Sequence, residues 1–182
     1  RQTRWDIGAG NVLVIHLTLI PYLSAAKELK TKPTQHSVKQ LLEAGIQPDI
    51  LVCRTEHHLP LEVKKKLALF CNVQFNCVIE AMDADTIYDI PLLMKKEKLD
   101  ERVISKLKLN PKFPSELDHW KDFLGKLKNP TQEVNIGLVG KYVSLPDAYK
   151  SIIESFTHAG AVLECKINLR LISSEEINAE NV

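Results

Sequence analysis

The segment whose residue types most clearly suggest chemistry covers residues 30–35 and reads Lys-Thr-Lys-Pro-Thr-Gln, followed by His36 and Ser37. It places two ammonium groups and two hydroxyls between an apolar run and a predicted helix. The first turn of a helix presents unpaired N–H groups and a partial positive charge, and such helix ends bind phosphate. The pattern predicts a polyphosphate site. The alternative is a solvated loop that contains two lysines.

Other polar residues give weaker signals. Lys66 is the third of three lysines on a predicted helix, where a run of charge usually marks a solvated face. The adjacent His57 and His58 do not predict a metal site, because neighbouring side chains project in different directions and no Cys or third His stands at ligand spacing. His16 lies inside a predicted strand and is interpreted as a hydrogen-bonded core histidine. Asp83 is compatible with a turn.

The glycines and cysteines do not predict catalytic groups. Residues 137–141 read Gly-Leu-Val-Gly-Lys and lack the spacing of a phosphate-binding P-loop. The four cysteines form no C-x-x-C pair, so we expect reduced thiols and a cytoplasmic protein. Cys165 lies in an alternating strand pattern rather than at a strand-to-helix elbow, which argues against a nucleophile. No catalytic residue is therefore expected within these residues.

Composition excludes several classes of protein. The chain has 182 residues, 45% of them hydrophobic, and 24 Lys+Arg against 23 Asp+Glu give a net charge of +1. A generic nucleic-acid binder needs a basic excess, which is missing. The longest apolar stretch, residues 12–20, is well short of the roughly 20 residues that cross a bilayer. The composition is that of an ordinary globular protein with no membrane span.

Alternating apolar patterns predict an α/β fold. The β-branched run 12–20 is typical of a parallel strand covered on both faces. A helix at 33–44, which ends before Gly45, and a strand at 49–53 come next. An amphipathic helix at 59–70, with Val63, Leu67 and Phe70 on its inner face, then leads to a strand at 77–79. Two short helices come next, one opened by Pro91 and one capped by Asp100. These elements predict a parallel sheet covered by helices.

A change in residue composition near residue 109, from apolar periodic segments to a polar segment with two prolines, predicts a second unit. Residues 109–115 form a polar connection with two prolines, and Ser115 with Asp118 resembles a capping box for a helix that carries Leu117, Trp120, Phe123, Leu124 and Leu127. A strand at 134–140, a helix at 147–158 with Ile152, Ile153 and Phe156 on its inner face, and a strand at 165–171 follow. We therefore place a domain boundary near Glu133 and predict three parts: residues 1–109, a linker with a helix at 110–133, and residues 134–182.

Several segments together resemble the cytidine triphosphate (CTP) synthase family in nearly colinear order. The match is carried by residues 15–18, 29–39, 45–50, 68–73 and 140–142, and residues 145–151 resemble the opening of that family's glutaminase domain. The resemblance implies the C-terminal part of a parallel-sheet synthetase domain in residues 1–109. It also implies the start of a class I glutaminase domain of flavodoxin-like fold in residues 134–182.

Members of that family use ATP to phosphorylate the 4-oxygen of uracil in UTP, and ammonia released from glutamine then displaces the phosphate to give CTP. The resemblance implies Mg²⁺ as cofactor, GTP as an activator, a homotetramer, and neither nucleic acid nor membrane as partner. It assigns UTP and the inhibitor CTP to Lys30, Thr31, Lys32, Pro33, Thr34, Gln35 and Lys66. It assigns the adenine of ATP to Met82, Asp83 and Ala84.

The resemblance also sets two expectations about this chain in particular. Lys27 stands where the family commonly has Gly, so a positive φ there would strain the loop before residue 30. The family's Mg²⁺ ligands and its glutaminase nucleophile are not found in these residues, so we expect an internal fragment that is inactive by itself. The alternative is a nucleotide-sensing or assembly module of α/β fold whose lysines serve an interface.

Overall fold

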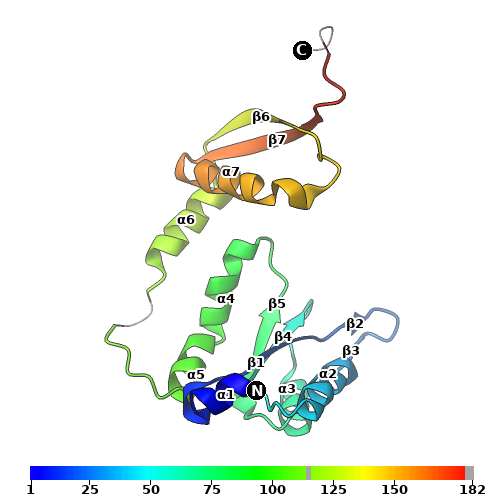
Figure 1. The fold of residues 1–182 in the computed structure, drawn as a ribbon, viewed down its shortest axis with the longest axis vertical. Coiled ribbons are helices and arrows are strands. Elements are labelled where there is room, and N and C mark those ends of the chain that lie inside the picture. Colours follow the sequence, from blue (N-terminus) through cyan, green and yellow to red (C-terminus); the bar gives the residue numbers. More distant parts are fainter. Residues whose placement is uncertain (114–115, 179–182) are drawn as a thin grey trace. The chain divides into compact units, whose positions relative to one another are not determined.

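A computed structural model describes residues 1–113 and 116–178. The chain divides by its internal contacts into two compact units, residues 1–114 and 115–182 (Figure 1). The three parts expected from the sequence, a synthetase part, a linker and a glutaminase part, stay a prediction. The division by internal contacts does not say to which family's domain each part belongs.

The first unit is built on a parallel sheet of β1 (Ile15–Leu19), β4 (Ile50–Thr55) and β5 (Val78–Met82), in the order β1-β4-β5. Ile15 lies opposite Ile50, and Leu51 lies opposite Val78. The parallel α/β architecture expected from the apolar runs is confirmed. The described residues of this unit also form these helices: α1 (Gln2–Asp6), η1 (Ala9–Asn11), α2 (Lys32–Glu43), α3 (Leu61–Phe70), η2 (Phe75–Cys77), η3 (Ile87–Asp89), α4 (Ile90–Lys96) and α5 (Leu99–Lys106).

The central strand β4 is covered on both faces because its side chains alternate between two cores. Leu51 and Cys53 pack with Val38 of α2 and Leu67 of α3. Ile50 and Val52 pack on the opposite side with residues of β5, and Met94, Leu99 and Val103 of α4 and α5 lie against that core. Burial of each of these aliphatic side chains on folding stabilises the folded state by about 1.5–3 kcal/mol.

The outer strand β1 differs from the expectation. Its residues Ile15, Leu17 and Leu19 are 45%, 68% and 54% exposed. The prediction that this strand is covered on both faces is wrong for the described residues. Thr18 and Ile20 are buried on the α2 side, whereas Leu17 on the opposite face lines a cavity with Met94 of α4 instead of packing in the apolar core of that face.

Three local predictions also need correction. Phe70, expected on the inner face of α3, is 61% exposed. Asp100 does not cap α5, because Lys98 occupies the N-cap position at φ 61°. The proposed capping box includes Ser115, which lies outside the described residues, and the helix itself begins at Asp118 after Leu117.

A small hairpin, β2 (Tyr22–Leu23) with β3 (Glu28–Leu29), replaces the expected polar loop after β1. The turn closes with Ala26 N–H donating to Leu23 O at 3.1 Å, and Lys27 adopts φ 49°. Lys27 therefore has the positive φ on which the expected strain was conditional. The hairpin delivers the chain to residue 30, because Lys30 N–H donates to Pro21 O at 2.9 Å.

The second unit repeats the strand-helix-strand pattern. It contains α6 (Asp118–Lys128), β6 (Gln132–Gly140), η4 (Pro146–Tyr149), α7 (Lys150–Val162) and β7 (Cys165–Ser173). β6 and β7 are parallel, and the Phe123 ring of α6 lies 5.4 Å from the His158 ring of α7. Ile152, expected on the inner face of its helix, is 40% exposed.

Across residues 1–113 and 116–178, the helices lack the length and continuous apolar character that crossing a bilayer requires.

The Lys27 turn yields a stability prediction. Lys27→Gly should raise the free energy of unfolding by about 1 kcal/mol, because the left-handed conformation costs an L side chain roughly that much. Lys27→Ala is the matched control, since it removes the ammonium group and keeps Cβ. Urea unfolding of both variants measures the difference, and a glycine variant no more stable than the alanine variant would contradict the assigned strain.

Candidate functional site

Three chain segments reach the same edge of the first unit's sheet, because the carboxyl ends of parallel strands lie together. After β1, the hairpin leads to residues 30–35 at the start of α2. After β4, the chain continues through His57 and His58 to α3. After β5, it passes through residues 82–84. The two nucleotide segments expected from the sequence therefore follow strands of one sheet.

The predicted helix start is confirmed to within one residue. α2 begins at Lys32, with Thr31 as N-cap and Pro33 in the first turn, where a missing N–H costs no helical bond. Thr31 is only 6% exposed, and its Oγ1 accepts a hydrogen bond from Gln35 Nε2 at 3.1 Å. This hydrogen bond between Gln35 and Thr31 stabilises the first turn of α2.

Thr34 is fully buried, and its side chain links α2 to β1. Its hydroxyl donates to Leu19 O at 3.1 Å and accepts from Thr18 Oγ1 at 3.0 Å. These bonds fasten the first turn of α2 to the last residues of β1. The Thr34 side chain therefore positions the helix end rather than facing solvent.

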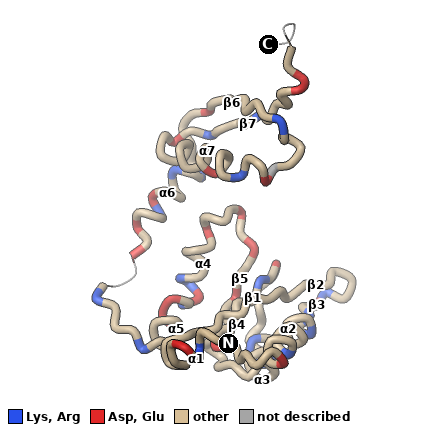
Figure 2. The backbone as a smooth tube through the Cα atoms, viewed as in Figure 1, with Lys and Arg blue, Asp and Glu red and all other residues tan. Residues whose placement is uncertain are grey.

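The two lysines carry the charge at this helix end (Figure 2). Lys30 is 40% exposed in its side chain and forms an ion pair with Glu28 of β3. Lys32 is exposed and has no ion pair among the described residues. A phosphate group that binds Lys30 must therefore displace the Glu28 carboxylate. The Lys32 ammonium group can bind a phosphate without displacing a carboxylate of the described residues.

Lys66 lies on an exposed position of α3. In the part of the chain that the structure describes, no hydrogen bond or ion pair joins it to Lys30 or Lys32. Five cavities of about 260 to 610 Å³ stand out among these residues, and none is lined by any of these lysines. Their grouping around one triphosphate stays a prediction.

Residues 82–84 lie in a cavity of about 470 Å³ at the end of β5. Its other walls include Leu17 of β1, Arg54 of β4 and Met94 of α4. Arg54 Nε donates to Asp83 Oδ1 at 2.9 Å, and this hydrogen bond, together with the carboxylate's charge, raises the pKa of the arginine. The sequence interpretation missed Arg54, although a lone charge within the apolar strand Ile-Leu-Val-Cys-Arg-Thr is a visible signal.

The paired histidines diverge, as expected of adjacent residues. The His57 ring packs at 4.1 Å on the Tyr22 ring in an edge-on arrangement, whereas His58 Nδ1 lies 2.6 Å from Glu80 Oε1. Across the described ranges no group of three or more His, Cys, Asp or Glu side chains is placed to hold a metal ion. His16 Nε2 lies 2.9 Å from Ser37 Oγ, which confirms the expected hydrogen bond, but His16 is half-buried and not part of the core.

The described thiols lie in places that do not favour nucleophilic chemistry. Burial raises the pKa of Cys53 to about 12 and that of Cys71 to about 11, so both hold their protons at neutral pH. Cys77 is buried as well. All four cysteines are free, as expected.

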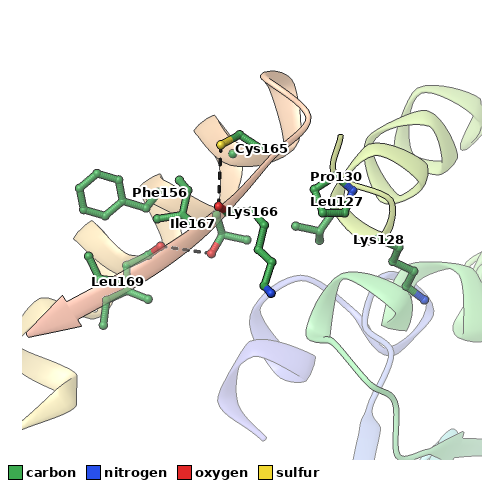
Figure 3. A pocket seen from close by; sticks show the side chains of 11 residues that line it. Leu127, Lys128, Pro130, Phe156, Cys165, Lys166, Ile167 and Leu169 are labelled. Atoms are coloured by element: carbon green, nitrogen blue, oxygen red, sulfur yellow. Dashed lines mark hydrogen bonds between the residues drawn. The ribbon is translucent and has the colours of Figure 1, made fainter. Parts of the chain in front are cut away.

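Cys165 lines a cavity of about 380 Å³ in the second unit (Figure 3). Its neighbours in that wall are largely apolar, and its Sγ contacts Lys166 O at 3.8 Å. The Lys166 ammonium group pairs with Glu133 at 3.2 Å. The cavity is lined by residues of α6, α7 and β7, and its apolar lining residues are half-buried: Leu127, Ile153, Phe156, Ile167 and Leu169.

The glycine segment at the end of β6 is explained by packing. A Cβ on Gly140 would collide with the Tyr149 hydroxyl, which accepts a hydrogen bond from Tyr142 N–H at 3.2 Å. Glycine is therefore needed there to admit the tyrosine.

Comparison with known proteins gives a consistent result. The family described as "CTP synthase N-terminus" matches residues 1–109. Proteins named CTP synthase from Cytophaga hutchinsonii, Flavobacterium johnsoniae and Bacteroides fragilis are 70%, 59% and 52% identical over the whole of this chain. The chain spans about a third of the length of these relatives, 34% in each case.

The Thr34 contacts yield a prediction on stability. Thr34→Val should lower the free energy of unfolding by about 1–3 kcal/mol, because it leaves the buried Thr18 hydroxyl and the part-buried Leu19 O contact without the Thr34 hydroxyl. Thr131→Val is a suitable control, since the Thr131 hydroxyl is exposed and makes one long bond, 3.3 Å, to Glu164 O. Chemical unfolding measures both, and equal stability of the two variants would show that Thr34 does not fasten α2.

Proposed function

Because the chain belongs to the CTP synthase family, we propose that its residues serve as part of an enzyme that makes CTP from UTP, ATP and glutamine. In the proposed reaction ATP phosphorylates the 4-oxygen of uracil, and ammonia from glutamine displaces that phosphate. The observation that supports a role in nucleotide binding is the start of α2 at Lys32, which the Thr34 hydroxyl holds at the carboxyl end of β1 through its hydrogen bond to Leu19 O. This is where α/β proteins bind phosphate.

The proposed task of residues 30–35 is to neutralise the triphosphate of UTP, and that of CTP when it inhibits. Lys30 and Lys32 supply the charge, and the N-terminus of α2 adds backbone N–H groups. The pairing of Lys30 with Glu28 fits this role, because the carboxylate holds the ammonium group near the helix end until an anion replaces it. Lys66 is proposed to reach the same nucleotide from α3.

ATP is proposed to bind at the cavity beside Met82, Asp83 and Ala84. Its walls offer apolar surface from Leu17, and the Arg54–Asp83 pair lies at the same cavity. A flat base fits between apolar walls, and the backbone of residues 82–84 supplies hydrogen bonds to it.

Mg²⁺ does not fit the described residues, which form no ligand set for it, and no step is derived through it. We propose that the parent enzyme supplies those ligands elsewhere and that glutamine hydrolysis belongs to its glutaminase domain. Residues 134–182 are proposed as the start of that domain, after a linker at 110–133. We also propose that the parent enzyme is activated by GTP, forms a homotetramer and is located in the cytoplasm.

The main prediction concerns nucleotide affinity. In a full-length CTP synthase that contains this chain, Lys30→Ala and Lys32→Ala should each weaken UTP and CTP binding together by about 1.5–3 kcal/mol, the worth of a charge-assisted contact. Lys39→Ala is the control, because Lys39 lies near the other end of α2 and is paired with Glu43 in solvent. Calorimetry measures the affinities, which should also fall as salt concentration rises.

This experiment also separates the alternative, an assembly or nucleotide-sensing module. Unchanged affinity of the two lysine variants, together with altered assembly in ultracentrifugation, would favour an interface role for Lys30 and Lys32. A flat response of UTP affinity to salt would likewise contradict the electrostatic site.

A second prediction concerns the isolated chain. The 182 residues alone should form no CTP and hydrolyse no glutamine, because the described residues present neither a metal ligand set nor an activated thiol. Product formation assayed with UTP, ATP and glutamine tests this. Turnover of either half reaction above that of a denatured control would overturn it.

A further inference from the structure

A network of charged side chains lies between the two proposed nucleotide segments. Glu80 stands in the middle of β5, and its side chain is only 8% exposed. Its Oε2 accepts a hydrogen bond from Leu59 N–H at 2.7 Å, and its Oε1 lies 2.6 Å from His58 Nδ1. The carboxylate thus fixes the chain just before α3 against β5.

Glu97, at the end of α4, completes the network. Its Oε2 accepts the backbone N–H of Glu80 at 3.1 Å and a hydrogen bond from Lys64 Nζ at 3.0 Å. β5 is an edge strand, so Glu97 satisfies a backbone donor that no neighbouring strand among the described residues reaches. Lys64 Nζ also lies 3.9 Å from Glu80 Oε2, which places one ammonium group between two carboxylates.

This network was not foreseen from the sequence, which placed Lys64 on a solvated face. The Lys64 side chain is 19% exposed and that of Glu97 is 27% exposed, so both are shielded from water. Removing one partner of such a pair is costly, because the other charge is left partly buried without compensation. Lys65, the next residue, behaves oppositely: its pair with Glu62 is exposed.

The network joins the two elements that carry the proposed nucleotide segments, α3 and β5. Lys64 lies two residues before Lys66 on α3, and Glu80 lies two residues before Met82 on β5. Met82 lines the proposed ATP cavity and also a smaller cavity of about 260 Å³ that Lys64, Glu80 and Glu97 share. A shift of α3 against β5 therefore moves Lys66 relative to residues 82–84.

We infer that Lys64, Glu80 and Glu97 are positioning residues that fix the UTP-binding helix α3 relative to the ATP-binding end of β5. This inference rests on the proposed function. The network touches neither nucleotide in this arrangement; it sets the separation of groups that must hold UTP and ATP close enough for phosphate transfer. Small displacements of such groups have large kinetic effects.

The test uses a full-length CTP synthase that contains this chain, with KM for UTP, KM for ATP and kcat measured separately. Lys64→Met should raise both KM values by roughly fivefold or more, in the range typical of coupled sites, because α3 loses its tie to β5. Lys64→Arg should restore both to within about twofold, since arginine keeps the charge and donors. Lys65→Met, whose pair is solvent-exposed, should change neither.

The outcomes separate the two proposals. If the unaltered enzyme forms no CTP from UTP and ATP, the proposed function fails. If it is active and Lys64→Met keeps both KM values while melting at a lower temperature, the network is merely structural and the inference is overturned. Glu97→Gln keeps the shape of the side chain and is the second variant if Lys64→Met does not fold; unchanged KM values in that variant would also overturn the inference.

Discussion

The arrangement of the first unit depends on the parallel alignment of β1, β4 and β5. Parallel strands carry their following segments to one edge, so residues 30–35 and 82–84 share that edge although they lie far apart in the sequence. The alignment is maintained by two apolar cores on opposite faces of β4. Without it, the lysines of one segment and the cavity of the other would have no fixed relation.

Polar groups in this unit divide into two kinds by their exposure. Lys30 and Lys32 stay in contact with water, where an ammonium group is free to exchange Glu28 or solvent for a phosphate. Thr34 and Glu80 are buried, and their hydrogen bonds fasten a helix or a loop to the sheet. The exposed groups are suited to binding, and the buried groups are suited to holding the binding groups in place.

Sequence periodicity and structure agree best where a segment is covered on both sides. β4 and α2 fall within two residues of their expected positions, because apolar spacing and a glycine stop signal both specify them. The apolar pattern and the observed burial disagree at the outer strand β1 and at the last residue of α3. The apolar run of β1 reads as buried, yet Leu17 is 68% exposed, because apolar residue type does not state whether a neighbour is present. Phe70 departs from the helical pattern for the same reason.

Local spacing and motifs that are contiguous in the chain were sufficient to predict the α/β class, the start of α2 and the family. Three contacts became visible in the folded chain alone: Lys64 turns inward to Glu97, Arg54 pairs with Asp83, and the Thr34 hydroxyl donates to Leu19 O. Each of them joins residues 15 to 33 positions apart, and a local pattern carries no information on which distant partner satisfies a polar group.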